Sequence, residues 1–142
     1  HCYDPIIFTH QTAQWIKGMP KDFHIAYPDT LANYRRWSAA FSKEYIGSLL
    51  HEGLTDVETS FFEANLSAAI SAAEKYDVPL YCSEYGVIHQ ADLESTLHWY
   101  QTISAVFEKH HIGRAAWTYK EMDFGLTDAE AFPVMQKVLP LL

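Results

Sequence analysis

Apolar residues recur at helical spacing in two long segments of the second half of the chain. From Ser60 to Tyr76 they occupy positions 62, 66, 69, 70 and 73, and from Asp92 to His110 positions 93, 97, 100, 103 and 107. Residues spaced in this way share one face of an α-helix, so the pattern predicts two amphipathic helices. Ser60 with Glu63 has the form of a capping box for the first helix, and Asp92 suits the N-cap of the second.

A short apolar segment follows each of these helices. Residues 80–84 come directly after Pro79, which disfavours helical geometry in the residue before it, and they read as a strand. Gly113 is expected to end the second helix in a left-handed turn, and residues 114–119 read as another strand. Thr127 and Glu130 form a second capping box, which predicts a last helix to about residue 139. Alternation of helix and strand predicts βα units and a parallel sheet.

The first half of the chain has a less regular pattern. Pro20 and Pro28 interrupt the residues that precede Tyr34, and the region between Pro5 and Thr59 reads as an extended loop followed by a helix. Apolar residues from Tyr34 to Leu49 then return to helical spacing and predict a helix. We find no internal repeat and no low-complexity stretch, so residues 1–142 are expected to form part of one domain, with no internal boundary.

Composition and charge exclude several classes of protein. The formal net charge of −8 argues against nucleic acid as a partner, because contact with a phosphate backbone needs a basic surface. No apolar run reaches the roughly 20 residues that cross a bilayer, so no membrane partner is expected. Cys2 and Cys82 are too few for a disulfide scaffold, and no histidine or cysteine spacing typical of a metal site occurs, so we expect no cofactor or metal. No leader segment is readable, and localisation stays open.

In parallel α/β sheets the functional groups project from the carboxyl ends of the strands. If the chain begins inside a strand, His1 and Tyr3 lie at one such end, Glu84 at a second and Trp117 at a third. Were these strands adjacent, the four side chains would converge on one pocket. Strand alternation would place Cys82 on the same face as Glu84, with Cys2 pointing oppositely, so a disulfide is not expected.

Four segments, in this order and at this spacing, resemble the cellulase-like glycoside hydrolases of family 5. They are His1-Cys-Tyr-Asp-Pro5, Phe8-Thr-His-Gln11 with Trp15, Pro79-Leu-Tyr-Cys-Ser-Glu-Tyr-Gly-Val87, and Ala116-Trp-Thr-Tyr-Lys120 with Asp123-Phe-Gly-Leu126. The resemblance covers the whole chain. It implies an α/β fold equivalent to the C-terminal part of a (β/α)8 TIM barrel, about strands 6–8 with their helices.

The same resemblance implies roles for individual residues. Glu84 matches the catalytic nucleophile, Tyr3 the tyrosine whose hydroxyl hydrogen-bonds it, and His1 a histidine lining the same subsite. Trp117 matches the tryptophan on which a sugar stacks beside the cleaved bond, and Lys120 is a candidate contact to an outer sugar hydroxyl. A retaining glycosidase also needs a second carboxylate as acid/base. In the family this glutamate lies on the fourth strand, outside this sequence.

The expected function is hydrolysis of a β-linked glucan or related polysaccharide by double displacement. A carbohydrate substrate is the expected partner, and activity is expected to require the missing N-terminal part of the barrel, since a full barrel takes about 250 residues. One alternative is a non-catalytic sugar-binding or inert fragment that keeps the aromatic site. A second is another barrel enzyme such as an aldolase or isomerase, for which the chain lacks a phosphate-binding glycine loop or a metal cluster.

Overall fold

The protein is described by a computed structural model that covers residues 1–142, except for the side chain of Phe132. Helices and two strands follow one another along the chain. They are α1 (Ile6–Thr9), α2 (Leu31–Phe41), the 3-10 helix η1 (Lys43–Leu50), α3 (Thr59–Tyr76), β1 (Tyr81–Tyr85), α4 (Leu93–Lys109), β2 (Gly113–Ala116), α5 (Phe132–Val138) and the 3-10 helix η2 (Leu139–Leu141). The expected alternation of helix and strand in the second half is confirmed.

Three chain segments run parallel at the centre of the molecule. β1 pairs with β2 in parallel register, with Tyr81 opposite Gly113. On the other side of β1, Cys2 forms a parallel bridge with Tyr85, so the chain start lies beside β1 as the sequence predicts. The register shifts between Cys82 and Tyr85, and this irregularity interrupts the strict alternation of faces on which the placement of Cys82 was based. Cys2 and Cys82 are both buried and free.

The two long helices lie where the apolar periodicity predicts them, but only one of their expected caps is correct. Asp92 accepts a hydrogen bond from the backbone N–H of Ser95, as an N-cap does. The expected capping box at the start of α3 is wrong, because its two side chains are engaged elsewhere. The Ser60 hydroxyl donates to Asp56, and the Glu63 carboxylate pairs with Lys109 on α4.

Three further predictions are wrong at element ends. Gly113 is the first residue of β2 rather than a helix cap, and the left-handed residue after α4 is His111. The last helix begins at residue 132, since Thr127 uses its hydroxyl to bond a backbone carbonyl in the preceding loop. The helix expected from Tyr34 to Leu49 is broken near Ser42, where α2 ends and η1 begins.

A continuous apolar core joins the sheet to the helices. Tyr85 on β1 is fully buried and lies against Trp99 and Phe107 of α4, with ring centroids 6.3 and 5.2 Å apart. The indole N–H of Trp99 donates to the backbone carbonyl of Asp4, at 2.9 Å, and so ties the chain start to α4. The apolar stripe of α3 is less covered than its pattern indicates, because Phe61 and Phe62 are its only fully buried residues among those described.

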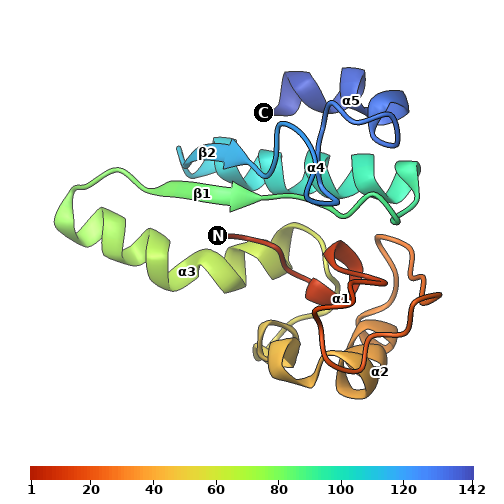
Figure 1. Ribbon diagram of the computed structural model, residues 1–142. Coiled ribbons are helices and arrows are strands. Elements are labelled where there is room, and N and C mark those ends of the chain that lie inside the picture. Colours follow the sequence, from red (N-terminus) through yellow and green to blue (C-terminus); the bar gives the residue numbers. More distant parts are fainter.

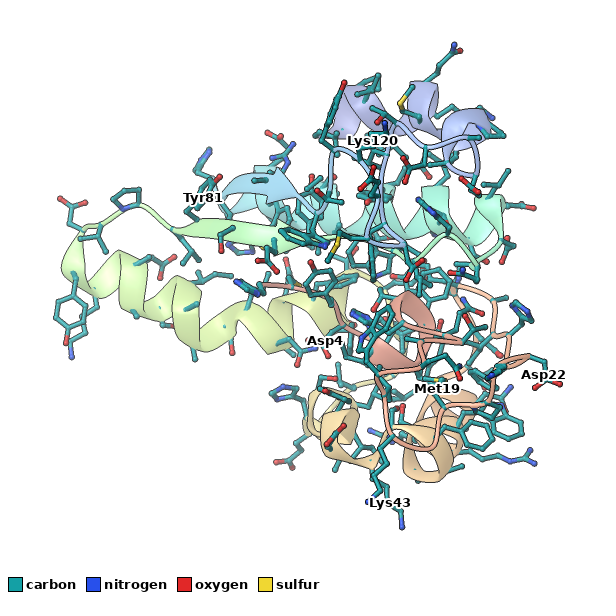
Figure 2. All side chains as sticks on the ribbon, viewed as in Figure 1. Asp4, Met19, Asp22, Lys43, Tyr81 and Lys120 are labelled. Atoms are coloured by element: carbon teal, nitrogen blue, oxygen red, sulfur yellow. The ribbon has the colours of Figure 1, made fainter. Side chains whose placement is uncertain are left out.

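Residues 4–57 form a helical lobe between the first parallel segment and α3. Figure 1 shows this lobe, with α1 and α2, beyond the carboxyl end of β1. In Figure 2, Met19, Asp22 and Lys43 all lie in the lobe, whereas Tyr81 lies at the opposite end of β1. The lobe therefore sits at the strand ends where functional groups of parallel sheets project. Within the described residues, we find no helix long and apolar enough to cross a bilayer.

Candidate active site

Backbone hydrogen bonds bring the three strand ends together. The N–H of Cys2 donates to the carbonyl of Glu84, and the N–H of Trp117 donates to the carbonyl of Tyr85, each at 2.8 Å. Gly86 allows the closest approach, because a Cβ at this position would lie 2.3 Å from the carbonyl oxygen of Trp117. The glycine in the Ser-Glu-Tyr-Gly segment is thus required for the fit between the ends of β1 and β2.

The Glu84 carboxylate receives two side chains from the first parallel segment. The Tyr3 hydroxyl donates to Oε2 at 3.3 Å, and the His1 Nδ1 lies 3.0 Å from the same oxygen. The Glu84 side chain is 28% exposed, whereas that of His1 is 60% exposed and lies at the rim. Both contacts hold the same carboxylate oxygen, which fixes the orientation of the group.

Tyr3 is held in a state suited to donating this bond. Burial and the neighbouring negative charge of Glu84 raise the pKa of the Tyr3 hydroxyl well above its ordinary value of 10.0. The hydroxyl therefore stays protonated across the range in which most enzymes work. Its ring packs edge-on against His10 and Phe124, with centroids 5.0 and 5.9 Å apart.

A cavity of about 410 Å³ opens in front of Glu84. It is lined by Tyr3, His10, Trp15, Glu84, Trp117, Met122, Asp123 and Phe124. Two tryptophans, two carboxylates and a tyrosine hydroxyl in one open cavity suit a sugar ring, with aromatic planes for its C–H faces and oxygens for the hydroxyls at its edge.

Of the residues predicted for the site, four come together and one does not. Tyr3, Glu84 and Trp117 line the cavity and His1 contacts Glu84. Lys120 is exposed and does not line it; Figure 2 shows Lys120 on the loop between β2 and α5.

The remaining residues of the cavity wall were not predicted as site residues. The signal for Trp15 was present, because it belongs to one of the four segments that carry the family resemblance. Trp15 is 58% exposed, which is unusual for so large an apolar side chain. His10 and Asp123 also belong to those segments.

His10 is an internal support of the cavity. Its Nδ1 lies 3.0 Å from the hydroxyl of Thr9, and its ring packs against Tyr3, Trp15 and Phe124. Burial lowers the pKa of His10 from 6.5 to about 4, so the imidazole is neutral at neutral pH.

A larger cavity, of about 520 Å³, lies elsewhere, and no tryptophan, tyrosine or phenylalanine is among the described residues that line it. It is bounded by the C-terminal ends of α3 and α4 and by Pro79 and Leu80, which precede β1. This is the amino end of the strand, where parallel α/β folds do not place their active sites. Among the described residues, no group of three or more His, Cys, Asp or Glu side chains is arranged to hold a metal ion.

Sequence comparison relates the chain to proteins named as an endoglucanase and a cellodextrinase. It is similar over its full length to "Endoglucanase C" of Acetivibrio thermocellus, with 32% identity over 143 residues that make up 41% of that protein. It is also similar to "Cellodextrinase A" of Ruminococcus flavefaciens, with 39% identity over 116 residues, which are 80% of this chain and 26% of that protein. No family model matches the sequence.

Comparison with solved structures gives the same picture of the fold. The endoglucanase Cel5A of Thermotoga maritima aligns with a TM-score of 0.64 at 23% identity, covering all of this chain and 37% of that one. A second structure, of a glycoside hydrolase, aligns with a TM-score of 0.66 at 14% identity, over 98% of this chain and 40% of that one. The chain spans about two fifths of the length of the curated relatives it matches first. The expected fold class, the C-terminal part of a (β/α)8 barrel, is confirmed.

Proposed function

Since this chain is a relative of the cellulase-like glycoside hydrolases and matches their C-terminal part, we propose that it carries the nucleophile half of an active site that hydrolyses β-linked glucans. The observation that carries the proposal is the Glu84 carboxylate, which lies at a strand end with its Oε2 contacted by Tyr3 and His1. It opens on a cavity whose walls include Trp15 and Trp117.

The proposed reaction is a double displacement. A carboxylate oxygen of Glu84 attacks the anomeric carbon, a glycosyl ester forms, and the bond to the departing sugar oxygen breaks as that oxygen takes a proton from an acid. Water then attacks the same carbon, gives its proton to the conjugate base, and frees Glu84. Because Oε2 is held by Tyr3 and His1, we assign Oε1 as the attacking oxygen.

Tyr3 supports this role through the hydrogen bond that its hydroxyl donates to the attacking carboxylate. The raised pKa of Tyr3 keeps its proton in place during the reaction. The aromatic side chains of Trp15 and Trp117 suit an uncharged sugar chain, and the net charge of −8 disfavours an anionic substrate at long range.

The acid/base of this mechanism is not assigned within the chain. A retaining glycosidase holds its two carboxyl groups roughly 5–5.5 Å apart, and Asp123 is the other carboxylate lining the described cavity wall. We place the acid/base in the part of the barrel that the longer relatives have and this sequence does not contain. On this proposal, cleavage of a glycosidic bond with a natural leaving group requires that acid/base.

The second candidate function is sugar binding without turnover. It is favoured by the same observation. The cavity offers aromatic planes and polar partners for sugar hydroxyls, but we assign only one catalytic carboxylate among its described residues. The two functions differ in whether Glu84 forms a covalent bond to the sugar.

The test uses a substrate that needs no acid catalyst. We would use a 2-deoxy-2-fluoro-cellobioside that carries fluoride or dinitrophenolate as its leaving group. This leaving group departs without taking up a proton, and the fluorine at C2 slows hydrolysis of the glycosyl ester. We expect mass spectrometry to find one fluorocellobiosyl group on the peptide that contains Glu84, and none in Glu84→Gln. Binding of cellotetraose by calorimetry, with no label on Glu84, would establish the binding role instead. A label on another carboxylate would refute the assignment of the nucleophile.

A further inference from the structure

The loop after β2 holds an unusual backbone conformation beside the cavity. Glu121, Met122 and Asp123 have φ angles of 64°, 59° and 61°, so three consecutive residues with side chains are left-handed. Residues other than glycine adopt this region singly and at a cost in energy, and aspartate tolerates it better than most. Such conformations persist where surrounding contacts enforce them, and they concentrate at ligand-binding sites.

Asp128 supplies the contact that closes this loop on itself. Its Oδ2 accepts a hydrogen bond from the backbone N–H of Glu121 at 2.9 Å, at the first left-handed residue. Gly125 makes room for this bond. A Cβ there would lie 2.2 Å from the Asp128 Oδ2 and 2.4 Å from the Glu121 nitrogen.

His89, from the segment between β1 and α4, supports the loop from behind. Its backbone N–H donates to the carbonyl of Asp123 at 2.9 Å. Its Nε2 lies 2.9 Å from the carbonyl oxygen of Gly125, which only accepts, so Nε2 carries the proton. The same nitrogen is 3.9 Å from the Asp128 Oδ2, and both side chains are largely buried. The loop is thus fixed by residues that do not themselves line the cavity.

The residues held in this way form one wall of the cavity. Met122 and Asp123 line it together with Trp117 and Glu84, and Met122 is 66% exposed. We propose that Asp128 is a positioning residue for sugar binding. By accepting the Glu121 amide it keeps the Met122 thioether and the Asp123 carboxylate facing the cavity, where they meet a sugar's C–H face and hydroxyl groups. The proposal rests on the sugar-binding role of the cavity proposed above.

Three variants separate positioning from general stability. Asp128→Ala removes the acceptor, Asp128→Asn keeps an oxygen at the same place, and Thr127→Val is the matched control. Thr127→Val deletes a different side-chain bond of the same loop, the one from Thr127 to the carbonyl of Tyr119. For each full chain we would measure amide hydrogen exchange at Glu121 and calorimetric affinity for cellotetraose. The exchange measurement needs no sugar.

We expect Asp128→Ala to speed Glu121 exchange and to weaken cellotetraose binding, each about tenfold, the scale of one hydrogen bond to a charged group. Asp128→Asn and Thr127→Val should stay within about threefold of the wild type. A lower melting temperature with unchanged affinity in Asp128→Ala would mean a purely structural role and would overturn this proposal alone. A wild-type chain that binds no oligosaccharide would overturn it together with the proposed function, whatever the exchange shows.

Discussion

The largely buried histidine in the cavity wall makes the stability of the protein depend on pH in a calculable way. His10 packs among three aromatic rings, from Tyr3, Trp15 and Phe124, and burial lowers its pKa from 6.5 to about 4. Protonation therefore favours the unfolded chain, in which the imidazole is solvated. The stability that neutral His10 contributes is fully present above about pH 6.5 and is lost as the pH falls toward 4.

The size of the effect follows from the difference between the two pKa values. One pKa unit is worth about 1.4 kcal/mol, so the full loss is about 3 kcal/mol, and about 2 kcal/mol of it has occurred by pH 5. His10→Phe keeps an aromatic ring in the same place and removes the titrating group. We expect this variant to be less sensitive to pH than the wild type by about 2 kcal/mol between pH 7.5 and 5.

Urea unfolding at pH 7.5, 6.5, 5.5 and 5 measures this difference directly. With slopes of about 2 kcal/mol/M, the wild-type midpoint should move down by roughly 1 M more than that of His10→Phe over this range. The carboxylates titrate in both the wild type and His10→Phe, so their contribution cancels in the difference between the two midpoint shifts. The exposed His24, changed to Phe, is the control for removal of a histidine. Equal pH dependence in the wild type and His10→Phe would refute the reasoning.

Three further predictions follow from single contacts. Gly86→Ala should destabilise the fold by about 2 kcal/mol or more, because its Cβ would lie 2.3 Å from the Trp117 carbonyl oxygen; Gly47→Ala, with no atom within 4 Å, should be neutral or slightly stabilising in the same thermal melts. Asp56→Ala should cost about 1 kcal/mol in urea unfolding, because it removes the acceptor at the start of α3, and an unchanged midpoint would contradict this. Tyr3→Phe removes the hydrogen bond to the cavity carboxylate and should slow labelling by the fluorinated cellobioside roughly tenfold to a hundredfold; an unchanged labelling rate would argue against that bond's role.

The elements that the sequence predicts well are those specified by neighbouring residues. The apolar periodicity placed α3 and α4 within one residue of their observed ends, and Asp92 caps α4 as expected. The two capping boxes failed because their side chains have other partners available. Ser60 and Glu63 have the spacing of a capping box, but Asp56 and the end of α4 compete for them. Local spacing carries no information about such distant competitors.

The same distinction applies to the candidate site. His1, Tyr3, Glu84 and Trp117 were predicted together from their places at strand ends and from the family resemblance, and the structure brings them together. Trp15 reaches the cavity from a loop after α1 whose path depends on contacts made elsewhere in the lobe. Residue propensities and apolar periodicity do not predict such contacts, so they do not predict the path of this loop.

The helical lobe of residues 4–57 has a consequence for the order in which the protein folds. Tyr3 and Glu84, which meet in the cavity, lie 81 residues apart in the chain. The pairing of Tyr81 with Gly113 closes a loop less than half as long. Each doubling of loop length adds about 0.6 kcal/mol of closure entropy, and non-local contacts form late. We therefore expect β1, α4 and β2 to assemble first and the carboxylate to meet its tyrosine last. On this reasoning, the parallel sheet and its helix form before the candidate active site is complete.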